Sequence, residues 1–590
     1  MQPVTLTRGV RCRVSRQEVW AHVSDTLRLN RAIGNSSLEA KPRDTRGLDR
    51  FELRGKVGGI PVAYVEHPFS WAVNEYFSFY RVFLGGPARS VSTRYDLTDV
   101  PDGPGCNVTV RIDVMPAAAV FRPLIWLATR RSIESLATYL AAADDARVSV
   151  ITSVDREMLA TAIKRLGDKH PKELVERLAQ HVGSADDFDL SPIRPFALAH
   201  EWKVDRFQLL RLCLEGVPAG LLELRWGIMC PSCQTTASVL TSLRELDRNA
   251  HCHACDLRYD TDLDRTVEAQ FFPHPSVREI DSRPYCIGGP ALTPHVLAQV
   301  PLEPETEGVL RAPEAEGRAR VFVRGGAVAS VDVLRGEPEE ATLTIAEGDL
   351  TPAVIAVAPG GAIRVVNKCG EARHAKLERT TITADAATAH HVATMPEFRP
   401  LFGAEALRPG LALKVAHVAI LFSDLCGSTA LYQKVGDAEA FGLVTDCLKF
   451  GTDIVERHGG TVVKTIGDAI MAAFSDSRGA VAAGAEMLTK WAEFAKDRPT
   501  AKNLDLKVGV HEGACTIVTA NGAVDYFGQT VNRAARVQHL AGPRELVIGA
   551  SLESVLSDRA GVQIAERFET TVKGIDEPLQ LMRVRPRPRE

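Results

Sequence analysis

The 590-residue sequence predicts a multidomain α+β protein, and three observations support this. At roughly 100–200 residues per domain, the length predicts about three to five domains. A composition of 45% hydrophobic and 24% charged residues is typical of globular proteins and excludes a mostly disordered or fibrous chain. The hydrophobic pattern also changes along the chain, from strand-rich, through helical, to alternating strands and helices.

Residues 1–145 are strand-rich and end in a helix. Three strand-like runs are present: Phe51 to Val57, Tyr76 to Leu84 and Asn107 to Val114. In the closing helix, Ile133, Leu136 and Leu140 recur at helical spacing, so one face should pack on the sheet. This order resembles a START-like helix-grip fold. The resemblance implies an apolar cavity for a small hydrophobic ligand; the alternative is a filled scaffold or a partner surface.

The middle of the chain divides into further regions by composition. We predict that residues 146–225 are helical, with a winged-helix-like unit as one hypothesis. Residues 226–300 should form a zinc ribbon, and residues 319–398 a small β-sandwich. We interpret the acidic, proline-bearing stretch that begins at Pro301 as a linker, and residues 399–413 as a second linker.

Four cysteines have the spacing of a metal site. The sequence contains two CxxC pairs eighteen residues apart, formed by Cys230, Cys233, Cys252 and Cys255. Four thiolates complete a closed tetrahedral zinc shell, which has no open position for chemistry. We therefore predict a structural Zn²⁺; the alternative is two unrelated redox pairs or buried thiols.

From Val415 the pattern predicts alternating strands and helices. The apolar run VAHVAILFSDLCGST reaches Asp424 and then a turn that opens a helix through about Glu456. The run GTVVKTIGDAIMAAF predicts a β-hairpin with Asp468 at its turn. In a ferredoxin-like βαββαβ sheet the first strand lies beside this hairpin. Asp424 and Asp468 would then be neighbours, and two carboxylates can bridge two Mg²⁺ ions.

Four motifs in this order resemble the catalytic domain of a class III adenylate or guanylate cyclase, over residues 414–585: FSDLCGST, VVKTIGDAIMAAF, LKVGVHEG and DYFGQTVNRAARV. The preceding TAHHVATMPEFRPLFGAEALRPG resembles the lead-in of bacterial multidomain members. The resemblance implies that Asp424, Asp468 and the Leu425 carbonyl bind two Mg²⁺ or Mn²⁺ ions. It also implies that Asn532 orients the ribose and that Arg536 stabilises the transition state.

Further positions carry substrate-binding roles by the same resemblance. Lys464 and Asp525 match the purine-selecting positions. The loop Cys426, Gly427, Ser428 and Thr429 can offer backbone amides to phosphates, and Lys573 is a candidate contact to the terminal phosphate. Lys507 stands where many members have arginine, which leaves its phosphate role open.

The donor and acceptor pattern of the base favours ATP. Adenine presents an acceptor at N1 and a donor at its amino group, which match a lysine ammonium at Lys464 and a carboxylate at Asp525. Guanine presents the opposite pattern. The substrate hydroxyl must attack the α-phosphorus in line, so the site has to position groups and stabilise charge. We therefore predict conversion of ATP to cyclic AMP and pyrophosphate.

Class III sites lie between two catalytic domains, and this sequence has one, so we predict a homodimer with two equivalent sites and control by the N-terminal domains. The alternatives are a guanylate cyclase, a non-catalytic nucleotide- or ligand-sensing module with a degenerate cyclase domain, or a zinc-dependent nucleic-acid regulator. A net charge of -4 gives no global field for nucleic acid or an acidic membrane. The sequence also has no evident membrane span or signal peptide, so we expect a cytoplasmic location.

Overall fold

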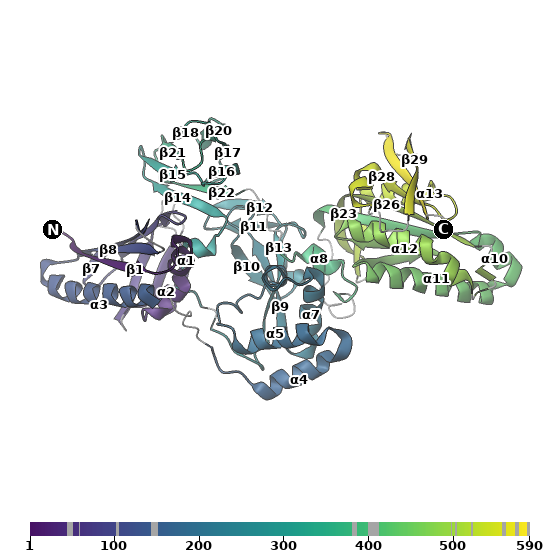
Figure 1. The fold of residues 1–590 in the computed structure, drawn as a ribbon, viewed down its shortest axis with the longest axis horizontal. Helices are drawn as coiled ribbons and strands as arrows, with labels where there is room; N and C mark the ends of the chain where they lie inside the picture. Colours follow the sequence, from purple (N-terminus) through teal and green to yellow (C-terminus); the bar gives the residue numbers. More distant parts are fainter. Residues whose placement is uncertain are drawn as a thin grey trace.

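The computed structural model describes residues 1–43, 51–57, 60–101, 105–142, 151–281, 283–379, 386–398, 412–496, 498, 500–501, 504–520, 523–556, 562–572 and 577–586. The molecule is elongated, with the N-terminal region at one end and the C-terminal domain at the other (Figure 1). Among the described residues, every helix is too short or too polar to cross a bilayer.

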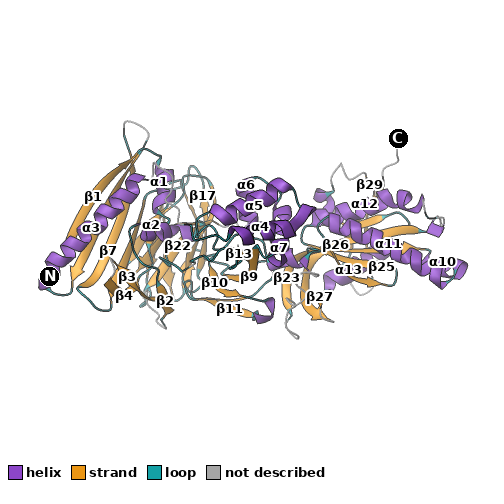
Figure 2. Ribbon diagram, turned by 90° about the horizontal axis from the view of Figure 1, so that it is seen from below, coloured by secondary structure: helices purple, strands orange, loops and turns teal. Residues whose placement is uncertain are grey.

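The N-terminal region has the predicted strand-rich pattern. Its elements are β1 (Val4–Cys12), α1 (Arg16–Val23), α2 (Thr26–Ala32), β2 (Glu39–Pro42), β3 (Phe51–Val57), β4 (Ile60–Glu66), β5 (Ser70–Ala72), β6 (Tyr76–Phe83), β7 (Ala88–Asp99), β8 (Cys106–Pro116) and α3 (Arg122–Ala141). Helix α3 packs against β1 and β8 (Figure 2) and buries Ile133, Leu136 and Leu140, as its spacing predicts. The capping box between Ser15 and Glu18 fixes the start of α1.

Aromatic side chains fill the space inside this first sheet. Phe77 stacks on Tyr95 with ring centroids 4.3 Å apart, and Trp20 meets Phe77 edge-on at 6.3 Å. All three side chains are buried. The described interior beneath α3 is therefore packed with side chains. The START-like assignment and its hydrophobic ligand stay hypotheses.

The central unit packs helices against a small sheet. Its elements are α4 (Arg156–Leu166), α5 (Lys172–Ser184), α6 (Pro195–Trp202), α7 (Arg206–Ala219), β9 (Leu222–Met229), β10 (Thr236–Leu240), β11 (Asn249–Cys252), β12 (Leu257–Asp260) and β13 (Val267–Pro273). Strand β9 lies between β10 and β13, while β11 and β12 form a separate hairpin. The predicted boundary at residue 225 falls inside β9, because β9 shares one core with the helices.

Residues 296–379 form a sandwich of two packed sheets, which begins before the predicted bounds of 319–398 and ends short of residue 398. Its strands are β14 (Val296–Leu302), β15 (Glu307–Arg311), β16 (Gly317–Val323), β17 (Val328–Val333), β18 (Glu340–Ala346), β19 (Asp349–Thr351), β20 (Val354–Val357), β21 (Ala362–Asn367) and β22 (Arg373–Arg379). One layer has the order β14-β22-β16-β17-β20 and the other β15-β21-β18-β19. Apolar side chains from both layers form one core.

The prediction of a linker that begins at Pro301 is wrong. Pro301 and Leu302 end β14, which pairs with β22, and Glu307–Arg311 is strand β15, which pairs with β21. The acidic residues project from edge and surface positions while Leu302 and Leu310 are buried. Strand β14 also pairs with β5, so the N-terminal sheet and one sandwich layer are a single 13-stranded sheet.

The C-terminal domain is a ferredoxin-like α/β sandwich with additional strands. Its elements are β23 (Leu413–Cys426), α10 (Ser428–Val435), α11 (Asp437–Arg457), β24 (Thr461–Ile466), β25 (Ala469–Phe474), α12 (Ser477–Lys496), β26 (Asp505–Ala520), β27 (Ala523–Phe527), α13 (Gln529–His539), β28 (Leu546–Gly549), β29 (Val562–Thr570) and β30 (Leu579–Pro586). The sheet order is β24-β25-β23-β26-β28-β30-β29, and β27 pairs with β26.

One predicted helix of this domain is two helices. The expected helix through about Glu456 is broken at Gly436, whose φ of 83° is left-handed backbone that glycine adopts without strain. The hairpin of β24 and β25 has its turn at Gly467 and Asp468, as predicted. The linker predicted at 399–413 lies outside the described residues up to 411, and Leu413 already belongs to β23.

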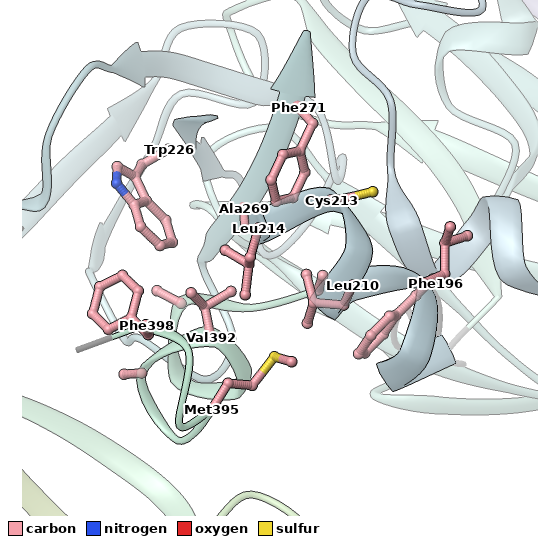
Figure 3. Close-up of a cluster of buried hydrophobic side chains, with 14 of the residues drawn as sticks. Phe196, Leu210, Cys213, Leu214, Trp226, Ala269, Phe271, Val392, Met395 and Phe398 are labelled. Carbon is pink, nitrogen blue, oxygen red and sulfur yellow. The ribbon is translucent and has the colours of Figure 1, made fainter. Parts of the chain in front are cut away.

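A short helix, α8 (Ala389–Ala393), joins the central unit to the C-terminal domain. Val392 of α8, together with Met395 and Phe398 just after the helix, packs in a buried core with Trp226 and the α7 side chains (Figure 3). The same buried cluster continues into one face of the C-terminal sheet through Val418, Ile420 and other side chains. Continuous apolar packing of this kind makes the central unit and the C-terminal domain mechanically coupled.

Candidate functional site

The two predicted metal aspartates lie at the same end of neighbouring strands. Strand β23 pairs with β25 in a register that sets Ser423 opposite Ile470, so Asp424 follows beside the Asp468 turn. A buried Oδ2 of Asp468 has no hydrogen-bond partner among the described residues. A buried carboxylate oxygen without a protein donor suits a cation ligand. The donor set thus fits hard divalent cations such as Mg²⁺ or Mn²⁺.

Asp424 also contacts a lysine from the strand on its other side. Lys507 on β26 lies opposite Asp424 in the register, and its Nζ is 2.9 Å from Asp424 Oδ2. Gln538 of α13 reaches the same oxygen at 3.5 Å. The sequence reasoning had considered Lys507 only as a phosphate contact. The side chains of β26 alternate between the two faces of the sheet. To predict that Lys507 contacts Asp424, the pairing of β26 with β23 must be known as well.

The thiol of Cys426 lies among these charges. Burial raises the pKa of Cys426, and the nearby carboxylates of Asp424, Asp505 and Asp468 raise it further against the opposing effect of Lys507. The thiol therefore stays protonated near neutral pH, which makes a thiolate ligand here unfavourable. Gly427 has φ of 91° and leads into α10. The turn that begins at Cys426 therefore lies beside Asp424, two residues earlier in the chain.

The two predicted purine-selecting residues meet in one protomer. Lys464 of β24 donates to both carboxylate oxygens of Asp525 of β27, at 3.0 and 2.8 Å. The Lys464 side chain is 38% exposed and that of Asp525 15% exposed, so the pair is open to a ligand from one side. The Lys464 ammonium also lies 5.5 Å from the ring centre of Phe527, a residue that the sequence analysis did not identify.

The other predicted residues divide into two groups. Asn532 and Arg536 lie one turn apart on α13, and both are exposed. Their spacing places them on one face of the helix, as predicted. Leu425 is buried in β23. Lys573 lies outside the described residues.

The four predicted zinc cysteines form one buried cluster. The Sγ atoms of Cys230, Cys233, Cys252 and Cys255 all lie within 4.8 Å of one another. Cys233 and Cys252 are 3.7 Å apart, close to the edge of about 3.8 Å of a tetrahedron with Zn–S bonds of about 2.3 Å. The cluster is compatible with a zinc site.

A lysine of the sandwich approaches this cluster. Lys376 of β22 is buried, and its Nζ is 3.7 Å from Cys255 Sγ. Burial acts to lower the pKa of Lys376, but the negative charges of Cys255, Cys233, Glu378 and Cys252 together outweigh burial and raise it. Phe322 of β16 packs on the same four cysteines. The cysteine cluster therefore connects the hairpin of β11 and β12, here called the ribbon hairpin, to the β-sandwich.

The fold and the acidic pair together define a class, the nucleotide cyclase type of ferredoxin-like domain. Comparison with known families agrees: residues 412–583 match the model described as the adenylate and guanylate cyclase catalytic domain. The C-terminal domain is a class III cyclase catalytic domain. Residues 154–285, the central unit, match a family of unknown function named DUF5939.

Two relatives illustrate how much of this chain the similarity covers. An uncharacterized protein of Mycobacterium tuberculosis is 33% identical over 168 residues, which are 28% of this chain and 41% of that protein. A protein of Streptomyces coelicolor named adenylate cyclase is 34% identical over 131 residues, 22% of this chain and 32% of that one. The chain thus spans less than half the length of the curated relatives it matches.

Solved structures align over the same region. The adenylyl cyclase CyaB of P. aeruginosa is 22% identical, with 30% of this chain and 98% of that chain covered and a TM-score of 0.28. The guanylyl cyclase Cya2 is 21% identical, with coverage of 29% and 92% and a TM-score of 0.27. The matching family model covers adenylate and guanylate cyclases alike, so the family match does not select the base.

Proposed function

We propose that this protein is an adenylate cyclase, which converts ATP to 3′,5′-cyclic AMP and pyrophosphate at a homodimer interface under control of its N-terminal regions. The observation that carries the choice of ATP is the ion pair of Lys464 and Asp525. Together the ammonium and the carboxylate present a donor to adenine N1 and an acceptor to the adenine amino group. Guanine presents the opposite pattern, so it would place a donor against the lysine ammonium and an acceptor against the carboxylate.

The cation site follows from Asp424 and Asp468. These two carboxylates, with the Leu425 carbonyl as a further donor, would hold two Mg²⁺ or Mn²⁺ ions. When bound, such ions lower the pKa of the ribose 3′-hydroxyl and neutralise triphosphate charge. Because Lys507 donates to Asp424 at 2.9 Å, the lysine has to leave this oxygen when a cation takes it. The released ammonium would then be available to phosphate oxygens.

Asn532 and Arg536 position the sugar and stabilise charge. The Asn532 amide can hold the ribose so that its 3′-hydroxyl is in line with the α-phosphorus. The Arg536 guanidinium can donate to phosphate oxygens as negative charge develops there. Both side chains are exposed in the single chain, in keeping with a site that a second protomer completes.

Product analysis tests this proposal directly. Purified protein is incubated with ATP or with GTP, each with Mg²⁺ or Mn²⁺, and cyclic nucleotides are separated by chromatography. We expect cyclic AMP from ATP, and loss of product in Asp468→Asn. Cyclic GMP as the main product would reject the base assignment. Nucleotide binding without any turnover would instead favour the sensing module.

A further inference from the structure

A cavity of about 980 Å³ lies where the N-terminal region, the central unit and the sandwich meet. Residues from all three parts line it, including Trp71, Ala197, Thr236 and His374. Helix α3 contributes none of the lining residues. This cavity is therefore different from the apolar pocket that a helix-grip fold would place beneath that helix. Its volume is in the range that holds a small organic ligand.

One part of the cavity wall is apolar. It contains aromatic and aliphatic side chains: Leu27, Phe69, Trp71, Phe188 and Ile287. Phe69 and Trp71 are buried in the N-terminal core and have little freedom to move. A rigid apolar wall of this kind favours a ligand with an apolar body, since such a ligand replaces water that has few partners there.

The remaining wall carries cations and unused donors. Its basic side chains outnumber its acids: Arg194, Arg265, Arg324, Lys376 and Arg379 against Glu66 and Glu268. Both acids already have partners, because Arg81 lies 2.6 Å from Glu66 and Arg194 lies 3.4 Å from Glu268. Arg194 is paired with Glu268, and Lys376 lies 3.7 Å from Cys255 Sγ, so the cations left to meet an anionic ligand group include Arg265 and Arg379.

Two buried histidines of the cavity wall each have a ring nitrogen that a ligand or water can satisfy. His374 is 5% exposed and its Nε2 has no hydrogen-bond partner among the described residues; His295 is 8% exposed and its Nδ1 likewise has none. Both line the cavity. A buried imidazole nitrogen without a partner is costly unless a ligand or water satisfies it. An anionic oxygen can accept from the Nε2–H of His374. The Nε2–H of His295 already donates to the Ser232 carbonyl at 3.0 Å, which leaves its Nδ1 as an acceptor for water or for a donor group of the ligand.

The cavity also touches the segment that leads to the catalytic domain. Thr388, which caps α8, lines the cavity, and it forms a backbone bridge with Glu268 of β13. The Ala269 amide donates to the Ala387 carbonyl at 2.7 Å. Helix α8 then packs on the catalytic domain, where the ring of His390 lies 6.4 Å from that of Tyr526, the neighbour of Asp525. A ligand that contacts Thr388 is therefore linked to the Lys464–Asp525 pair through α8 and Tyr526.

We propose that this cavity binds a small anionic amphiphile, a carboxylate or phosphate monoester on an apolar chain, and that its binding alters cyclase turnover through α8. The anionic group is held by His374 and the guanidinium groups of Arg265 and Arg379, and the chain lies against Phe69 and Trp71. The effect on turnover rests on the proposed function, whereas the binding itself does not.

Calorimetric titration of the full chain tests the binding. The probes are decanoate, decyl phosphate and decanol, which share one chain and differ in the headgroup. We expect saturable binding of one anionic probe per chain, and binding of decanol at least about tenfold weaker because it cannot form charged hydrogen bonds. Equal binding of decanol would overturn the anionic assignment. The absence of saturable binding by both anions would overturn the site.

Two pairs of variants locate the bound probe. Ala197→Trp on α6 fills the cavity, whereas His200→Trp adds the same ring on the exposed face of that helix. We expect the first to weaken binding at least about tenfold and the second to leave it unchanged. The double change Arg265→Gln and Arg379→Gln should weaken only the anions, with Arg248→Gln, exposed and outside the lining, as control. Unchanged binding in both the Ala197 and arginine variants would place the probe elsewhere.

A turnover assay with the same probe series separates the two claims. We expect saturating anion to change cyclic nucleotide formation at least about twofold in the wild type and in His200→Trp, and to have no effect in Ala197→Trp. Binding without a change in turnover would overturn the coupling through α8. A chain that binds the probe but makes no cyclic nucleotide would overturn the proposed function and leave the binding site supported.

Discussion

At the residue scale, the contact between Lys464 and Asp525 restricts the chemistry of the site most strongly. Their ion pair joins two strands of one chain, β24 and β27, and each side chain restricts the other. An ammonium with three donors shares them between the Asp525 carboxylate and an incoming base. The pair is therefore preorganised for a base with an acceptor beside a donor, which reduces the cost of ordering these side chains on binding.

We predict that Lys464→Glu combined with Asp525→Cys lowers ATP use and raises GTP use. Each lost charged hydrogen bond to adenine should cost about 1.5–3 kcal/mol, or roughly 10- to 100-fold in kcat/KM. Steady-state kinetics with both nucleotides measures the change. Lys449→Glu, on the exposed face of α11, is the matched charge control. Unaltered ATP turnover in the double variant would show that these positions do not read the base.

At the element scale, the ribbon hairpin depends on its four cysteines for a core. The hairpin of β11 and β12 is short, and its buried cluster consists of the cysteines and Phe322 with Leu257 and Tyr259 beside them. So small a core cannot by itself stabilise a two-stranded unit, so a metal bound by the four cysteines would be the main source of its stability.

We predict about one zinc per chain by metal analysis, and loss of that zinc in Cys233→Ser. The variant should also unfold at a lower temperature, because metal-binding free energy contributes to folding. Cys369→Ser, a cysteine outside the cluster, should keep both the zinc and the stability of the wild type. A zinc content that is unaffected by Cys233→Ser would exclude these thiolates as the ligands.

Helix α8 makes the junction with the catalytic domain sensitive to acid. Burial lowers the pKa of His390 to about 3 and that of His391 to about 4. Below the unfolded pKa of about 6.5 the unfolded chain binds protons that the folded chain cannot, so stability falls between pH 6.5 and about 4. Above pH 6.5 both histidines are neutral in both states and have no effect.

We predict that His390→Phe reduces this pH dependence. Between pH 7.5 and 5.5 the wild type should lose about 1.4 kcal/mol more stability than the variant, the contribution of one neutral buried histidine. Urea unfolding at the two pH values measures the difference. His200→Phe, an exposed histidine of α6, should leave the pH dependence as it is. Equal pH dependence in wild type and His390→Phe would mean that His390 is protonated in the folded state.

At the scale of the whole molecule, the residues that we propose to be catalytic separate into two groups within one chain. Asp424 and Asp468 lie at the ends of β23 and the β24–β25 turn, whereas Asn532 and Arg536 lie exposed on α13. Two exposed apolar side chains lie near the Lys464–Asp525 pair: Ile466, which is 55% exposed, and Phe527, which is 49% exposed. A second copy that covered them would bring its own acidic pair to the exposed helix face.

Mixing two inactive chains tests this arrangement. We predict that Asp424→Ala and Arg536→Ala are each inactive alone, and that their mixture regains up to about a quarter of wild-type activity, since half of the chains form mixed dimers with one intact site. Turnover of the mixture is compared with that of each chain at equal total concentration. A mixture as inactive as its components would mean that one chain supplies the whole site.

The elements that could be predicted are those fixed by neighbouring residues. The hairpin around Asp468, the helix that carries Asn532 and Arg536, and the approach of the four cysteines all follow from local spacing, and the structure contains each of them. The contact of Lys507 with Asp424 could not be predicted, because it joins residues on strands whose pairing depends on the folded sheet. The same holds for β5 and β14, which join distant parts of the chain.

The sequence by itself determined the kinds of chemistry that this protein carries: paired carboxylates beside a turn, a lysine and an aspartate for a base, and four thiolates for a metal. Their order and spacing depend on local periodicity and turn residues, which act over a few positions. Only the tertiary structure decided that β14 completes an N-terminal sheet, that α8 couples the central unit to the catalytic domain, and that a cavity lies where three parts meet. These features depend on apolar surfaces and strand edges far apart in the chain, whose fit is decided only when they pack together.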